Sequence, residues 1–131
     1  MKGGYWVRMG AIAGFLAVGL GAFGAHGLKE RLAEIGRQDN YQTAVEYHMA
    51  HALAMILVGL LGFHVERSRA LNLAGWSFLV GIVIFSGSLY ILALTGLRWL
   101  GAITPIGGVA LLVGWVALAL SVGRSEKTLS S

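Results

Sequence analysis

Four long stretches of this chain contain no Asp, Glu, Lys or Arg, and they constrain its fold more than any other feature. They run over Met9–Leu28, Tyr47–Val65, Ala70–Leu97 and Trp99–Gly123, with lengths of 20, 19, 28 and 25 residues. An α-helix rises about 1.5 Å per residue, so about 20 apolar residues cross the hydrocarbon core of a bilayer. The sequence therefore predicts an all-α integral membrane protein, a bundle of four transmembrane helices.

The composition agrees with this class and excludes several kinds of chemistry. Hydrophobic residues make up 56% of the chain, and there is no cysteine to form disulfides, thiolate metal sites or a nucleophile. No serine stands in a G-x-S-x-G motif, and no glycine-rich loop follows a strand, so we assign no catalytic residue. The net charge of +4 comes from basic residues that flank the apolar stretches. We therefore expect the lipid bilayer, and no nucleic acid, as a partner.

We interpret residues 1–131 as one transmembrane domain with spans at about 9–28, 44–65, 70–97 and 100–123. Between the first two spans, residues 28–36 place Leu28, Leu32 and Ile35 at helical spacing among charged residues. This pattern predicts a short amphipathic helix that lies in the membrane interface.

Local signals predict where some of these helices begin and end. Gly36 is expected to end the amphipathic helix, and Asp39 with Gln42 resembles a capping box that starts the second span. Thr104-Pro105 has two interpretations. The pair forms the N-cap and first residue of the fourth helix, or it kinks a helix that begins near Trp99.

Basic residues near the span ends favour one orientation. Six of them lie on the side of the two termini and four on the other side: Lys2, Arg8, Arg67, Arg69, Arg124 and Lys127, against Lys29, Arg31, Arg37 and Arg98. The positive-inside rule therefore favours both termini in the cytoplasm, and insertion in both orientations is the alternative.

Small residues recur at helical spacing in three of the four spans. Such residues let helices approach closely in lipid, either within one protomer or between protomers, and we expect a homo-oligomer. The residues assigned to helix packing are Gly10, Gly14, Ala17, Gly21, Ala25, Ser77, Gly81, Gly108 and Gly114.

Three histidines are the strongest candidates for a polar site. His26 ends the first span, and His48 and His51 begin the second, so all three are expected at a similar depth near one membrane face. Tyr47 and Met55 lie on the same side of the second helix as this His pair. One helix would thus present His, His, Met and Tyr side chains to one neighbour.

This cluster has three interpretations. The histidines can form hydrogen bonds between helices, bind a metal ion or haem iron, or relay protons or a solute. A structural role is the first expectation, so no cofactor is assigned, and His26, His48 and His51 are the ligands if a metal binds.

Four segments together resemble a known family. They are Gly21–Leu28, Tyr47–Ala54, Phe85–Tyr90 and Leu94–Gly108, where the last holds Leu94-Thr95-Gly96 and Gly101–Gly108. In order and spacing they are similar to the small four-span bacterial membrane proteins of domain-of-unknown-function family 423, which has eukaryotic relatives. The resemblance implies an inner-membrane protein without implying an activity. It draws attention to Ser88, Tyr90 and Thr104 as further members of the polar cluster.

These observations lead to one expected function and two alternatives. The first is a non-enzymatic protein that binds or organises a ligand, lipid or partner through the histidine-containing site. The second is a small oligomeric transporter or channel, although the embedded parts of spans one, three and four lack the charged group that ion-coupled transporters use. The third is a metal- or haem-binding redox accessory protein.

Overall fold

The computed structural model describes residues 3–65 and 68–130, and within these residues all regular structure is helical. The elements in chain order are α1 (Gly3–Ala25), α2 (Lys29–Ile35), α3 (Gln38–Leu61), α4 (Arg69–Gly81), η1 (Ile82–Ser86), α5 (Gly87–Thr95) and α6 (Leu100–Ser130). Because α4, η1 and α5 run on as one rod, four helices are long and apolar enough to cross a membrane. The prediction of an all-α four-span bundle with a short helix after the first span is confirmed.

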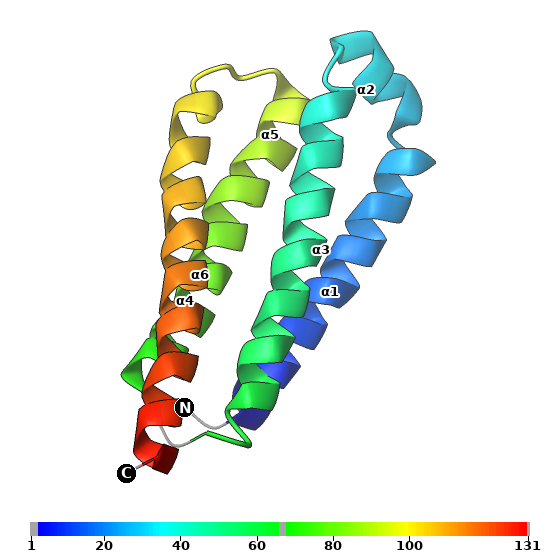
Figure 1. Ribbon diagram of the computed structural model, residues 1–131. Helices are drawn as coiled ribbons and strands as arrows, with labels where there is room; N and C mark the ends of the chain where they lie inside the picture. Colours follow the sequence, from blue (N-terminus) through cyan, green and yellow to red (C-terminus); the bar gives the residue numbers. More distant parts are fainter. Residues whose placement is uncertain (1–2, 66–67, 131) are drawn as a thin grey trace.

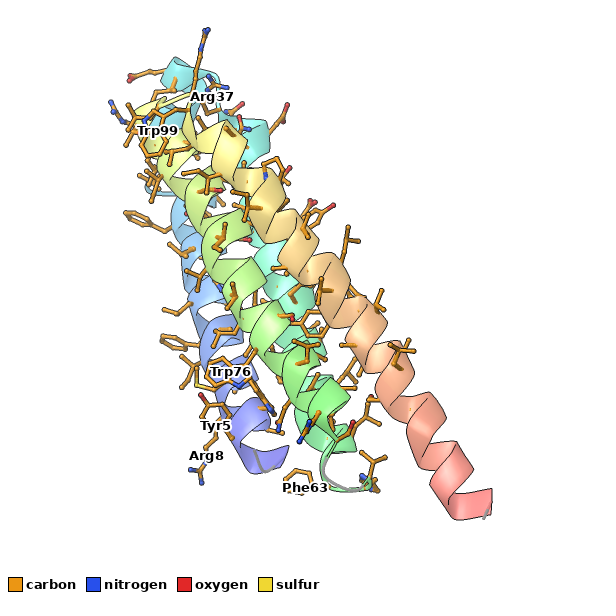
Figure 2. The ribbon with its side chains drawn as sticks, turned by 90° about the vertical axis from the view of Figure 1, so that its left-hand side faces the viewer. Tyr5, Arg8, Arg37, Phe63, Trp76 and Trp99 are labelled. Atoms are coloured by element: carbon orange, nitrogen blue, oxygen red, sulfur yellow. The ribbon has the colours of Figure 1, made fainter. Side chains whose placement is uncertain are left out.

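The four long helices run antiparallel to their chain neighbours (Figure 1). Helix α2 lies across one end of the bundle, while the start of α1 and the end of α6 lie at the opposite end. Side chains suited to membrane interfaces mark both ends: Trp99 lies at the α2 end, and Tyr5 and Trp76 lie near the other (Figure 2). The spans therefore extend from one aromatic belt to the other.

Glycines end two of the helices as the sequence suggests. Gly36 after α2 and Gly96 after α5 adopt φ of 72° and 73°, the left-handed conformation that favours glycine. The Arg31 side chain also donates to the Leu94 carbonyl at 3.3 Å, which ties α2 to the carboxyl end of α5. The short helix is thus fixed to the bundle by a backbone acceptor that the end of a helix leaves open.

One predicted helix start is wrong, and one of the two interpretations of Thr104-Pro105 is excluded. Helix α3 begins at Gln38 with Arg37 at the N-cap position, which makes no side-chain cap bond. Gln42 donates instead to Glu46 one turn later, at 3.1 Å, so the Asp39–Gln42 capping box does not form. Thr104 is not an N-cap either. Helix α6 begins at Leu100 and contains Pro105, as the second interpretation of that pair required.

Most of the packing glycines contact helices of the same chain. A Cβ atom at Gly10 would lie 2.7 Å from the Ile56 side chain and 2.8 Å from the Ala52 carbonyl oxygen, so α1 and α3 touch backbone to backbone. Cβ atoms at four other predicted positions would also meet neighbours within the chain: Gly14 and Gly21 face α3, Gly81 faces α6, and Gly114 faces Phe78. These contacts remove the glycine-based argument for a homo-oligomer.

The remaining packing positions vary in burial. Ala17 is fully buried, Ser77 is half-buried and Ala25 is exposed at the end of α1. A Cβ atom at Gly108 would be in ordinary contact with Phe85, at 3.7 Å. The small residues assigned to helix packing therefore form a continuous row only along the part of α1 that faces α3.

Candidate functional site

His51 lies buried near the middle of α3, and both of its ring nitrogens have partners. Nδ1 lies 2.7 Å from the Tyr47 carbonyl oxygen, and the Trp115 indole donates to Nε2 at 3.0 Å. A carbonyl can only accept and an indole N–H can only donate, so Nδ1 carries the proton and Nε2 is the acceptor. His51 is therefore a neutral imidazole that joins α3 to α6 with no free nitrogen.

His48, one turn earlier on α3, bonds to the third span. Its Nδ1 lies 2.9 Å from the Tyr90 hydroxyl of α5, and which of the two groups donates depends on the histidine tautomer. The His48 side chain is buried, and its ring lies edge-on to that of Tyr90 with centroids 5.9 Å apart. This pair therefore joins α3 to α5.

Aromatic rings surround His51 on the α6 side. Tyr47 stacks on the imidazole with ring centroids 5.9 Å apart, and Trp115 and Phe78 lie edge-on or tilted at 5.8 and 5.7 Å. Tyr47 and Trp115 are each 44% exposed, so they cover the histidine from the lipid side. Met55, predicted to join this cluster, is fully buried in the apolar core.

Serine and threonine side chains connect the third span to its neighbours. Ser86 donates to the Ala44 carbonyl of α3 at 2.8 Å, and the Ser88 and Thr104 hydroxyls lie 2.6 Å apart between α5 and α6. Ser86 ends the π-helical segment η1, whose wider turn changes the direction of the residues that follow. Ser86 and Ser88 thereby reach two different helices from one turn.

His26 does not join the other two histidines. It is exposed in the turn after α1, whereas His48 lies beside Ala13, which is near the middle of α1. The 13 residues between Ala13 and His26 correspond to on the order of 20 Å along a helix axis. The predicted common depth is wrong because α3 begins at Gln38, which moves His48 and His51 to mid-span.

No group of three His, Asp or Glu side chains that could hold a metal ion occurs in the part of the chain that the structure describes. The polar residues instead form separate pairs between helices: His48 with Tyr90, His51 with Trp115, and Ser88 with Thr104. The residues predicted as one cluster therefore form separate hydrogen-bonded pairs, each of which includes a residue of α3 or α5.

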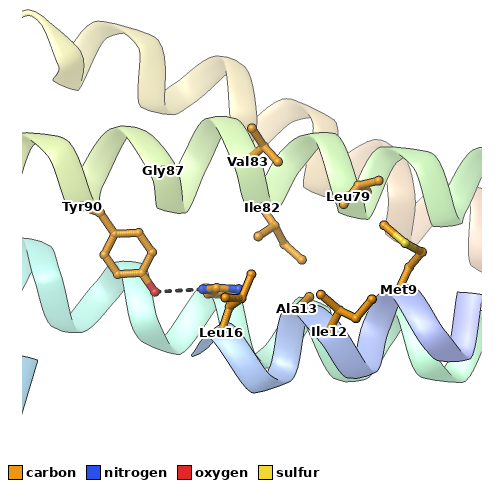
Figure 3. Close-up of a pocket in the computed structure, with 10 residues that line it drawn as sticks. Met9, Ile12, Ala13, Leu16, Leu79, Ile82, Val83, Gly87 and Tyr90 are labelled. Atoms are coloured by element: carbon orange, nitrogen blue, oxygen red, sulfur yellow. Dashed lines mark hydrogen bonds between the residues drawn. The ribbon is translucent and has the colours of Figure 1, made fainter. Parts of the chain in front are cut away.

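A groove of about 340 Å³ opens beside the His48–Tyr90 pair. It lies between α1 and the rod of α4, η1 and α5, and this pair sits at its base (Figure 3). Its walls are almost entirely apolar, and the residues that line it are Met9, Ile12, Ala13, Leu16, His48, Leu79, Ile82, Val83, Gly87 and Tyr90. All of them lie within the spans, from Met9 near the start of the first span to Tyr90 near the end of the third.

The sequence analysis missed two residues of this site. Trp115 carried a signal, because an indole in the middle of a span needs an acceptor for its N–H. Ser86 stood in the Phe85–Tyr90 segment but was not singled out.

A four-span apolar bundle with hydrogen bonds between its helices defines the class: a multi-pass α-helical membrane protein. The chain belongs to the family described as protein of unknown function DUF423, whose family model matches residues 20–108. This confirms the resemblance seen in the sequence.

Similar proteins carry names that agree with a membrane location. A UPF0382 membrane protein, YwdK of Bacillus subtilis (strain 168), is 46% identical over 116 residues, covering 88% of this chain and 94% of its own. A UPF0382 membrane protein of Haemophilus influenzae is 40% identical over 126 residues, covering 96% of this chain and 98% of its own. No solved structure gives a significant match.

Proposed function

We propose that this chain is a non-enzymatic binding protein of the bacterial inner membrane, with both termini in the cytoplasm. Its ligand is a lipid-soluble small molecule that occupies the groove between α1 and the α4–η1–α5 rod. The observation that carries this proposal is the groove itself, an apolar space of about 340 Å³ with a His48–Tyr90 pair at its base. Apolar walls with a few placed polar groups are typical of small-molecule sites.

The depth of the groove supports a ligand that comes from the bilayer. Its lining residues lie within the spans and include no charged residue. Ile12, Leu16 and Val83 on its rim are exposed and would face lipid. A molecule dissolved in the bilayer reaches such a groove sideways, without crossing an aqueous entrance.

The two alternatives have less support. A metal or haem site on His51 would require the bond from Trp115 to Nε2 to break. A transporter would need the bound molecule to move between the two faces, and the hydrogen-bonded pairs hold the neighbouring helices in one arrangement. Binding is therefore the function that the geometry favours.

Saturable labelling tests the proposal. The protein would be placed in phosphatidylcholine nanodiscs with a hexadecane probe that carries a photoreactive diazirine, and labelled residues would be mapped by mass spectrometry. We expect labelling of Met9 and Leu16 to saturate with probe concentration, and labelling of Phe15 to rise without saturation. Phe15 is 78% exposed on α1 and does not line the groove.

A matched pair of variants sharpens the test. Gly87 lines the groove, and a Cβ atom there would meet open space, so Gly87→Leu fills the groove without a backbone clash. Gly19→Leu adds the same side chain to open space outside the groove. Gly87→Leu should abolish the saturable labelling and Gly19→Leu should preserve it. Equal labelling of the two variants would refute the groove as the binding site.

A further inference from the structure

A second pocket lies at the α2 end of the bundle, away from the groove beside His48 and Tyr90. It has a volume of about 440 Å³ and opens between the last turns of α1, helix α2 and the first turns of α3. Trp99 lies at the same end of the bundle, which α2 crosses (Figures 1 and 2). Because tryptophan side chains gather at the headgroup level of a bilayer, this interfacial pocket lies where lipid headgroups are found.

The base of the interfacial pocket is built from side chains that are already packed. The Tyr41 hydroxyl donates to the Leu20 carbonyl at 2.5 Å, and the Tyr41 ring lies directly against Gly24, where a Cβ atom would overlap it. Tyr41 and Leu32 are both buried in the same apolar cluster. The shape of the pocket is therefore set by the contact between α1 and α3 and does not depend on a ligand.

The walls of the interfacial pocket carry one charge of each sign. Lys29 is the first residue of α2, and Asp39 lies in the first turn of α3 with Gln38 and Gln42 beside it. Within residues 3–65 and 68–130, neither Lys29 nor Asp39 forms an ion pair or a side-chain hydrogen bond. Both side chains are exposed, so both charges are available to a bound molecule.

The side of the pocket formed by α3 offers mainly hydrogen-bond acceptors. Asp39 accepts only, and the Gln42 amide nitrogen already donates to Glu46 at 3.1 Å, which leaves the Gln42 carbonyl oxygen open. Glu46 adds a second negative charge one turn below Gln42. A cation that carries N–H groups therefore matches the α3 side, whereas the Lys29 ammonium on the α2 side matches an anion such as phosphate.

We propose that the interfacial pocket binds the headgroup of a phospholipid with a primary amine, such as phosphatidylethanolamine. Its phosphate lies at Lys29, and its ammonium donates to Asp39 and to the Gln42 carbonyl. The hydrocarbon chains continue over α1, where Val18 is exposed on the same helix face as Gly21 of the pocket. This site is independent of the proposed function, because it shares no lining residue with the groove.

Competition between lipids tests this assignment. The protein in detergent micelles would receive equal amounts of phosphatidylethanolamine, phosphatidylcholine and phosphatidylglycerol with the same acyl chains, and native mass spectrometry would identify the bound lipids by mass. Phosphatidylcholine keeps the phosphate and has no N–H on its cation, and phosphatidylglycerol has no cation. Since exposed charge pairs contribute little, we expect phosphatidylethanolamine to bind about two- to fivefold more strongly than either.

Two substitutions separate the contributions of the ammonium and the phosphate. Asp39→Asn should bring the affinity for phosphatidylethanolamine close to that for phosphatidylcholine. Lys29→Gln should weaken the binding of both lipids and preserve the ratio between them. Glu34→Gln and Arg98→Gln are the controls, because they remove exposed charges of the same two signs at the same end of the bundle, outside the pocket. Both controls should bind the lipids as the native protein does.

The outcomes decide the assignment. A preference for phosphatidylethanolamine that Asp39→Asn removes and Glu34→Gln retains supports it. Equal binding of phosphatidylethanolamine and phosphatidylcholine by the native protein, or a preference that Asp39→Asn retains, would overturn it. Glycerophosphoethanolamine carries the same headgroup without hydrocarbon chains. If this soluble molecule displaces the lipid at equal concentration, the pocket recognises a soluble ligand and the lipid assignment is wrong.

Discussion

The bond between His51 and Trp115 shows how one side chain can join two helices that otherwise meet little in the interior. Among the residues that the structure describes, the Trp115 indole is the donor to Nε2, and His51 is buried. Removing the donor would leave a buried acceptor unpaired, which costs more than the net value of the bond.

We therefore expect Trp115→Phe to lower the free energy of unfolding by about 1 kcal/mol or more. Phenylalanine keeps a ring beside Phe78 and removes the N–H. The measurement is unfolding in mixed detergent micelles with increasing dodecyl sulfate. Trp99→Phe is the control, because Trp99 is 61% exposed at the end of the bundle. Equal losses for both variants would mean that the bond to His51 contributes nothing.

The sequence singled out the histidine pair, and the family resemblance added Tyr90, but neither indicated which residue pairs with which. His48 and His51 stood out because charged or polar groups are rare within spans. Their partners Tyr90 and Trp115 are 42 and 64 residues away in the chain, and no local pattern encodes such distances. Residue types within a span can therefore be predicted to matter, whereas their pairing requires the arrangement of the helices.

At the scale of single helices, the glycines of α1 determine how closely it approaches α3. At Gly10 a methyl group would overlap both the Ile56 side chain and the backbone of Ala52. At Gly19 a methyl group would meet nothing within 4 Å. The two positions belong to the same helix, so they differ in packing and not in helix propensity.

Gly10→Ala should lower the midpoint of thermal unfolding in detergent, because overpacking typically costs about 1–3 kcal/mol. Gly19→Ala should leave the midpoint unchanged or raise it slightly, since alanine favours a helix over glycine. Tryptophan fluorescence can report the transition, since one of the four tryptophans, Trp6, is buried in the core. A Gly10→Ala protein as stable as Gly19→Ala would contradict the close contact between α1 and α3.

Helix identity was easier to predict than helix length or local geometry. Charge-free stretches predicted all four spans, because burial in lipid excludes charges from whole helices. The start of α3 was missed because polar residues such as Gln38 and Asn40 extend the helix beyond the apolar region. The π-helical segment Ile82–Ser86 was missed as well, since its residues are as apolar as those of any α-helix.

At the scale of the whole molecule, the bundle has two distinct ends. One end carries α2 with Lys29, Arg31 and Arg37, and the other carries Arg8, Arg69 and the turn after α3 (Figures 1 and 2). The 6-to-4 distribution of basic residues favours the cytoplasm for the second end.

The absence of cysteine makes this orientation directly testable. Single cysteines at Glu34 of α2 and at His64 after α3 lie at opposite ends, and both positions are exposed. In intact cells, a membrane-impermeant maleimide should label Glu34→Cys and reach His64→Cys only after the membrane is opened. The reverse pattern would place the termini outside, and equal labelling would show dual insertion.

The π-helical segment makes the effect of a length change in the third span depend on where the change falls. A π turn holds one residue more than an α-helical turn, so a deletion within Ile82–Ser86 would remove that extra residue and let the span continue as a regular α-helix. Tyr90 and Ser88 would still point toward His48 and Thr104, because five residues of π-helix and four of α-helix both turn the chain by about 400°. A deletion within the regular helix α4 has no extra residue to absorb it, so the two parts of the span would turn by about 100° relative to each other. Neither deletion would show in a hydropathy profile, yet only the second would move one part of the span away from its present neighbours.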